Sequence, residues 1–168
     1  MNEFDTINDL FSSYAKLLLE DSHARFKALR TCHFFKPVPD EWLQRISEMA
    51  QIKTFHSDVR ITSQDEQMKA FYVILYGTAE AFRNGRVVGT IESGDCFGEG
   101  IFFTDGSLTT SATVIAEDRI IAAEFSQTAI DALQADAHAM VSMDKALLLA
   151  LFKKLKGANL KIEKLMLR

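Results

Sequence analysis

The hydrophobic period of this 168-residue chain changes twice, and this change restricts the fold more than any other feature. Apolar residues recur at helical spacing in the first third, alternate with a period of two from Gln51 to about Phe125, and then return to helical spacing. The pattern predicts a β domain with helices on either side of it. With 48% hydrophobic residues, the chain can bury one core and still have a helical appendage.

The middle segment is predicted to form short antiparallel strands joined by tight turns. Asn84-Gly85 is the clearest hairpin signal, because a type I′ turn needs positive φ at both central residues. Gly77 and Glu117-Asp118 mark two further turns. Short strands at regular intervals are typical of a small barrel or sandwich. The expected strands are 52–55, 59–61, 71–75, 78–82, 87–91, 112–116 and 119–124.

Helical stripes precede and follow these strands. A third helix is expected to start near Pro39, since proline and acidic residues favour the first turn of a helix. Ser126 is a candidate N-cap for a short helix over 127–133, and a long helix is expected from about Ala137 to the end. The apolar residues of the first three stripes are Phe4, Ile7, Leu10, Phe11, Tyr14, Leu17 and Leu18; Phe26 and Leu29; and Trp42, Leu43, Ile46 and Met49.

The last helix carries an apolar seam that repeats every seven residues, which predicts a homodimer formed through this helix. Gly157 lies outside the seam and is expected to face water. The alternative is that a single apolar face of the helix packs back onto the β domain. One heptad position of the seam holds Val141, Leu148, Leu155 and Ile162, and the other holds Asp144, Leu151, Ala158 and Leu165.

Composition excludes several classes of protein. The net charge of −4 argues against general nucleic-acid binding, and no apolar segment approaches the ~20 residues that span a bilayer. The acidic N-terminus is unlike a signal peptide, and two cysteines, Cys32 and Cys96, suit a reducing cytoplasm. No nucleophile elbow, nucleotide-triphosphate loop or metal-ligand spacing of histidines is present, so we predict a non-enzymatic protein without a metal.

The segment SGDCFGEGIFFTDGSLTTSATV, residues 93–114, resembles a loop that cradles a small anionic ligand. Gly98 and Gly100 flank Glu99, and glycine lets a ligand approach the backbone closely. Several segments, in order, resemble the cyclic nucleotide-binding domain of the catabolite-activator family. They are LRTCHFFKPVPDEWLQRI, FYVILYGTAEAF, SGDCFGEGIFF, SATVIA and AEFSQTAIDAL.

The resemblance implies an α+β fold that is mainly β: a jelly-roll (double-stranded β-helix) with N-terminal helices and a long C-terminal dimerisation helix. The implied division is an N-terminal helical extension at 1–28, a β-roll domain at 29–135 and a C-terminal helix at 136–168. In the family, the glycine and glutamate of the cassette bind the phosphate and the ribose hydroxyl. The implied ligand-binding residues here are Gly98, Glu99, Gly100, Thr110, Ser111 and Ala112.

The sequence departs from the family at Thr110, where the family places the arginine that pairs with the cyclic phosphate. No lysine or arginine lies between Arg86 and Arg119, and the loop itself is acidic through Glu92, Asp95, Glu99, Asp105, Glu117 and Asp118. An anion is therefore repelled unless a distant cation folds over the site. The candidate cations are Arg60, Arg83 and the lysines among residues 153–156.

Two functions remain open at this point. The first is a regulatory module that binds cyclic AMP, cyclic GMP or a related small ligand weakly. The second is a degenerate domain that binds no ligand and serves as a scaffold for dimerisation or for an unidentified protein partner. Transcription factors of the family continue into a winged helix-turn-helix, which this chain does not contain, so we do not expect it to bind DNA directly.

Overall fold

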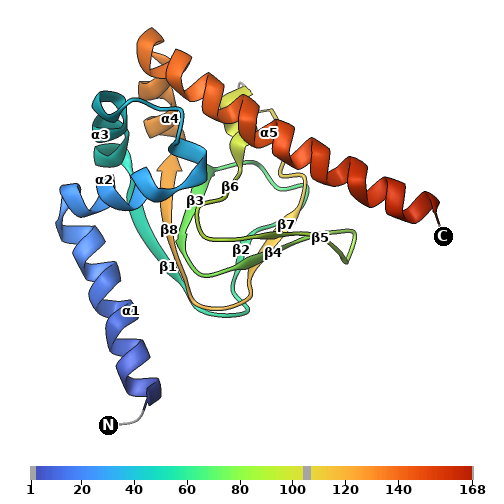
Figure 1. Cartoon of the computed structure of the whole chain (residues 1–168), viewed down its shortest axis with the longest axis horizontal. Helices are drawn as coiled ribbons and strands as arrows, with labels where there is room; N and C mark the ends of the chain where they lie inside the picture. The colour runs from blue at the N-terminus through green and yellow to red at the C-terminus, as the bar shows by residue number, and fades with distance from the viewer. Residues whose placement is uncertain (1–2, 104–106, 168) are drawn as a thin grey trace.

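The computed structural model describes residues 3–103 and 107–167, with side chains described from residue 6 onward. Two long helices, α1 (Glu3–Glu20) and α5 (Ala137–Met166), flank a β roll, and Figure 1 shows α5 running along one side of it. The helices are α1 (Glu3–Glu20), α2 (Ser22–Thr31), α3 (Asp40–Met49), α4 (Gln127–Gln134) and α5 (Ala137–Met166), with short 3-10 turns η1 (His33–Phe35) and η2 (Glu99–Phe103). The strands are β1 (Gln51–Phe55), β2 (Arg60–Thr62), β3 (Ala70–Tyr76), β4 (Ala79–Arg83), β5 (Arg86–Ile91), β6 (Cys96–Phe97), β7 (Thr113–Ala116) and β8 (Ile120–Ser126).

The eight strands form two antiparallel four-stranded sheets, and this confirms the predicted jelly roll with flanking helices. One sheet has the order β1-β8-β3-β6 and the other β2-β7-β4-β5. The expected hairpin is present between β4 and β5, where Asn84 and Gly85 have φ of 50° and 73°. The two-residue strand β6 was not predicted, because so short a segment cannot show alternation.

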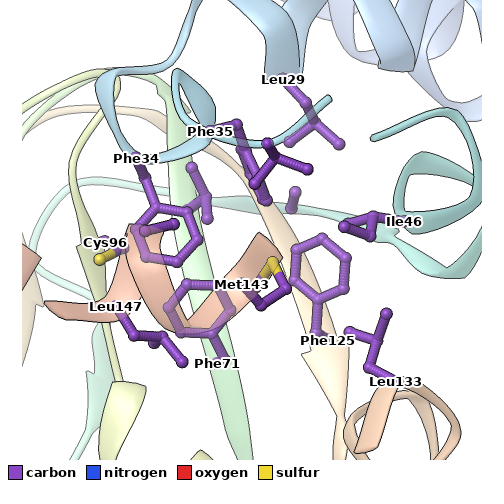
Figure 2. Packing of buried hydrophobic residues seen from close by; sticks show 14 of the residues in the cluster. Leu29, Phe34, Phe35, Ile46, Phe71, Cys96, Phe125, Leu133, Met143 and Leu147 are labelled. Carbon is purple, nitrogen blue, oxygen red and sulfur yellow. The ribbon is translucent and has the colours of Figure 1, made fainter. Parts of the chain in front are cut away.

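The central strands of the first sheet, β3 and β8, are mostly buried on both faces. Successive residues of a strand point in opposite directions, so each strand contributes side chains to both faces. In β3, Tyr72 and Ile74 face the interior of the roll, whereas Phe71 and Val73 face the helices. On the helical side, Phe71 packs at 5.8 Å from Phe125, measured between ring centroids. Figure 2 shows this cluster, in which residues of α2, η1, α3 and α5 meet the sheet.

Helix α1 covers the outer face of the first sheet only in part. Phe11 and Leu18 are buried, and they pack with Ile121 of β8. Ile7, Leu10 and Leu17, which belong to the same predicted stripe, are exposed. The side chain of Phe4 lies outside the described residues. The stripe therefore predicted the helix correctly, although only part of it is covered by the β domain.

Helix α5 has two segments with different surroundings. In the first segment, Ala139, Met143, Ala146 and Leu147 are buried in the core. From Leu151 to Leu167, every described residue of the chain is exposed. Apolar packing therefore fixes the start of α5, whereas its distal segment extends beyond the core.

Candidate ligand-binding site

A cavity of about 1040 Å³ lies between the β roll and α5. The six residues that the resemblance assigned to ligand binding all line it: Gly98, Glu99, Gly100, Thr110, Ser111 and Ala112. The opposite wall is formed by α5, with Ala150, Lys153, Lys154, Gly157 and Lys161 among its lining residues. The fold thus brings both halves of the cassette together, and a helix borders the same space.

Gly98 shapes the first half of the cassette through its backbone. Its φ is +78°, and a Cβ atom at this position would lie 2.5 Å from the carbonyl oxygen of Ala70. The tight turn and the close approach to β3 both require glycine. Ile101 donates its backbone N–H to the Gly98 carbonyl at 3.2 Å, which places Glu99 at the start of η2.

Gly100 is less constrained than Gly98. A Cβ at Gly100 would meet only the flexible end of Met68, at 2.8 Å from Cε. The side chain of Met68 can give way, so the backbone does not demand glycine at residue 100 as strictly as at residue 98.

Thr110 holds the second half of the cassette to a neighbouring turn. Its side chain is 9% exposed, and its hydroxyl donates to the carbonyl oxygens of Ser63 and Glu66, the latter at 2.8 Å. A hydroxyl has a single proton, so it serves one of these carbonyls at a time and has none left for an anion in the cavity. The backbone is fixed as well, since Thr110 N–H donates to Glu66 and its carbonyl accepts from Asp65, both at 2.8 Å.

The remaining residues of this half differ in exposure. Ser111 is exposed and Ala112 is half-buried, directly before β7. The carbonyl of Ala112 accepts a hydrogen bond from the Thr62 hydroxyl at 3.4 Å. Ser111 therefore presents its backbone and hydroxyl to solvent at the cavity, while Ala112 joins the loop to the second sheet.

Two lysines of α5 pair with two acidic residues of the cassette, Asp95 and Glu99. Lys154 Nζ lies 2.6 Å from Glu99 Oε1 and donates to the Cys96 carbonyl at 3.0 Å. Lys153 Nζ lies 2.8 Å from Asp95 Oδ1. The carboxylate that would accept ribose hydroxyls by resemblance is thus already paired with the helix that borders the site.

A third lysine of α5 also reaches the roll, and the other predicted cations do not line the cavity. The ammonium of Lys161 donates a hydrogen bond to the backbone carbonyl of Val88 in β5. Of the distant cations proposed from the sequence, those of α5 at Lys153 and Lys154 line the cavity. Arg60, Arg83 and Lys156 do not line it. Lys161 was not among the predicted cations, although the sequence could have indicated it, because it lies seven residues after Lys154 on the helix face that also carries Ala150 and Gly157.

The thiol of Cys96, which lines the cavity, is held in its protonated and unreactive form. Burial raises the pKa of the Cys96 thiol to about 12; Lys154 lowers this value and Glu99 and Asp95 raise it. The thiol is therefore protonated at neutral pH. Within residues 3–103 and 107–167, no three His, Cys, Asp or Glu side chains gather to hold a metal ion. Asp105, one of the acidic residues of the predicted loop, lies outside the described residues.

The predicted seam lies on the face of α5 that is not packed on the core. Val141, Leu148, Leu155 and Leu165 are 59–70% exposed. Leu151 and Ile162 are also exposed, but they line the cavity. Gly157 is exposed as expected, although it faces the cavity. The helix thus has a buried face and a separate exposed apolar face, rather than a single face packed on the β domain.

Two facing antiparallel sheets, with a glycine-bearing loop and a helix around one cavity, define a β-roll domain with a candidate ligand-binding cavity. The sequence profile described as the cyclic nucleotide-binding domain matches residues 52–136, about half of the chain, and the chain belongs to this family. None of the curated proteins matches the sequence. In the part of the chain that the structure describes, no helix is both long and apolar enough to cross a membrane.

Solved structures share the fold at low sequence identity. A putative cyclic nucleotide-binding protein from Geobacter metallireducens is 17% identical with a TM-score of 0.68, and the match covers 77% of this chain and 96% of that one. The regulatory domain of Toxoplasma gondii protein kinase A, crystallised with cAMP, is 18% identical with a TM-score of 0.60, covering 74% and 49%. The regulatory subunit of a cAMP-independent protein kinase A from Trypanosoma brucei is 14% identical with a TM-score of 0.67, covering 88% and 50%. The match spans about half of each kinase regulatory chain.

Proposed function

We propose that this chain is a non-catalytic regulatory module whose cavity takes a small ligand and whose α5 responds to it. Cyclic AMP and cyclic GMP bind this module only weakly. The observation that carries the proposal is the hydroxyl of Thr110, which donates its proton into the protein. By resemblance, Thr110 occupies the position of the family's arginine. The same fold occurs in a domain crystallised with cAMP and in a cAMP-independent subunit, so particular residues decide which ligand binds.

The absent arginine has an energetic consequence. A guanidinium gives a phosphate two charge-assisted hydrogen bonds in a fixed geometry, which a threonine hydroxyl cannot reproduce. Its loss costs roughly 2–4 kcal/mol, or about one and a half to three decades in affinity. Lys153 and Lys154 compensate little, because each is already paired with a carboxylate of the cassette. Lys161, the third lysine that lines the cavity, donates to the Val88 carbonyl of β5 rather than to the cassette.

The pairing of Glu99 with Lys154 links ligand binding to α5. A ligand whose hydroxyls bind Glu99 must share this carboxylate with the Lys154 ammonium or displace the ammonium. Such a ligand has different affinities for the conformations with and without the Lys154–Glu99 pair, and it therefore shifts the equilibrium between them. The distal segment of α5 has no buried residue in the described chain, so little apolar packing opposes its movement. The helix is the element through which the module signals.

The exposed seam of α5 supports a second candidate function, a scaffold for a homodimer or for another protein. Val141, Leu148 and Leu155 form an exposed apolar line on α5, and such a line on a surface helix is a common interaction surface. The two functions are compatible, since Val141, Leu148 and Leu155 do not line the cavity. The chain has two buried free thiols, Cys32 and Cys96, which suit a protein that acts in a reducing cytoplasm.

Titration followed by amide NMR tests the proposed function. Cyclic AMP is expected to shift the amides of Gly98–Gly100 and the distal residues of α5 together, with half-saturation above about 100 µM. Thr110→Arg is expected to tighten this binding at least tenfold, provided that its circular dichroism spectrum matches that of the wild type. Amide shifts confined to residues outside the cavity would contradict the proposed sensor function, and the scaffold function would remain. Micromolar binding by the wild type would contradict the role given to Thr110.

A further inference from the structure

The cavity has an unusual lining for a site that receives a charged, hydroxyl-rich ligand. Large apolar side chains on a protein surface are normally scattered, but here several that are 37–55% exposed line the same space. An exposed apolar patch inside a concave site marks a binding surface for an apolar group. The side chains are Val87, Val88, Phe103, Leu149, Leu151 and Ile162.

These side chains come from both walls of the cavity. Val87 and Val88 belong to β5 in the roll, whereas Leu149, Leu151 and Ile162 belong to α5. Val88 is 43% exposed and Leu149 is 54% exposed, so neither is covered by the other wall. An apolar body placed between β5 and α5 would bury both walls at about 25 cal/mol for each Å² removed from water.

The charges of the cavity lining do not cancel. Asp95 and Glu99 are paired with Lys153 and Lys154, which leaves Lys161 as the unbalanced charge when His33 is counted as neutral. Across the described residues, Lys161 has no carboxylate within ion-pair distance. Its ammonium carries three donors, and the bond to the Val88 carbonyl uses one of them. Lys161 can therefore still bind an anion at the edge of the apolar wall.

The geometry points to an acyl-chain carboxylate as the ligand of this cavity, with its chain between β5 and α5 and its carboxylate on Lys161. This inference rests on the proposed function, because it names the ligand class of the same sensor. One ammonium beside an apolar wall suits a singly charged head with an apolar tail. Binding would draw α5 onto the roll, since the chain contacts both.

The test uses the full chain and a fluorescent fatty acid, 11-(dansylamino)undecanoate, whose emission rises in an apolar site. Decanoate is expected to displace this probe with a dissociation constant in the tens of micromolar. The alcohol 1-decanol, which has the same chain without the charge, is expected to bind at least tenfold more weakly. Failure of the probe to bind at up to 1 mM would overturn the inference, as would equal affinities for decanoate and decanol.

Matched variants locate the ligand. Lys161→Gln should weaken decanoate about tenfold and leave decanol unchanged, whereas Lys156→Gln, a lysine of α5 away from the cavity, should change neither. Leu149→Gln should weaken both ligands, and Leu155→Gln, on the exposed seam, should weaken neither. Equal effects of Lys161→Gln and Lys156→Gln, or a larger effect of Leu155→Gln than of Leu149→Gln, would contradict the assignment.

The outcome is distinguishable from failure of the proposed function. If decanoate does not bind while cyclic AMP still shifts the amides of Gly98–Gly100 and α5, the sensor stands and the ligand class assigned here is wrong. If neither compound changes the cavity or α5, both proposals fail and the scaffold remains.

Discussion

Thr110 is the residue on which the interpretation of the site depends, and the structure gives it a structural role. Its hydroxyl donates into the turn at Ser63 and Glu66, next to a backbone pairing with the same turn. Thr110→Val keeps the shape but removes the side-chain hydrogen bond, while each carbonyl keeps a backbone N–H donor. We expect the free energy of unfolding in urea to fall by about 0.5–1.5 kcal/mol. Thr109→Val is the control, since Thr109 is exposed, and an equal loss in both variants would contradict this role.

A comparison of alanine substitutions at Gly98 and Gly85 separates the energetic cost of positive φ from the cost of steric contact. Both have positive φ, at 78° and 73°, but a Cβ at Gly98 would lie 2.5 Å from the Ala70 carbonyl, whereas nothing lies within 4 Å of one at Gly85. Gly85→Ala is expected to cost about 1–2 kcal/mol from φ alone. Gly98→Ala should cost at least about 1 kcal/mol more, measured by thermal or urea unfolding. Equal losses would mean that the close approach to β3 does not matter.

At the scale of elements, the distal segment of α5 is attached to the roll by lysines rather than by apolar packing. Removing the contacts with Lys153→Gln and Lys154→Gln together should raise hydrogen exchange in residues 151–166 several-fold, because exposed ion pairs contribute about 0.2–1 kcal/mol each. Lys156→Gln with Lys164→Gln is the control, since these lysines form none of the observed ion pairs. Unchanged exchange in the first pair would show that other contacts hold the segment.

Gly157 lies within that same helical segment, and its replacement provides an independent prediction. A Cβ at this position would meet nothing within 4 Å, so Gly157→Ala introduces no clash. Alanine favours the helix over glycine by about 1 kcal/mol. We expect a higher helical signal in circular dichroism and slower exchange near residue 157. A loss of helix would indicate that glycine has a packing role here.

The sequence predicted the elements better than their contacts. Periodicity located all but the shortest strand, and Ser126 caps α4 as expected, accepting a hydrogen bond from Ala129 N–H at 3.4 Å. The six cassette residues line one cavity because the roll brings the segment after β6 close to the segment before β7. The pairing of Lys154 with Glu99 depends on how α5 crosses the roll, and no local pattern determines that crossing.

At the scale of the whole molecule, two thiols make stability depend on pH. Burial raises the pKa of Cys32 and of Cys96 from 9.0 to about 12. Below pH 9 both states keep these protons, but above it the unfolded chain releases them first. Each thiol should therefore lower the free energy of unfolding by up to about 1.4 kcal/mol per pH unit from pH 9 toward 12. Cys32→Ala with Cys96→Ala should flatten this slope, and an unchanged slope would contradict it.

The exposed seam predicts that the molecule assembles through α5. Leu148→Gln with Leu155→Gln is expected to convert a dimer into a monomer in analytical ultracentrifugation, because both side chains lie on the uncovered face. These substitutions leave the core intact, whereas truncation before α5 would remove Met143 and Leu147 from it. Leu160→Gln, also exposed but outside the seam, is the control. A wild-type monomer at 100 µM would exclude the seam as a homodimer interface.

Calorimetric titration of the wild-type chain with cyclic AMP and cyclic GMP tests the central claim most directly. Since Thr110 supplies no positive charge and the nearby Lys153 and Lys154 are already paired, we predict dissociation constants above about 100 µM for both nucleotides. A dissociation constant of a few micromolar or less for either nucleotide would show that another cation clamps the phosphate, and would contradict the account.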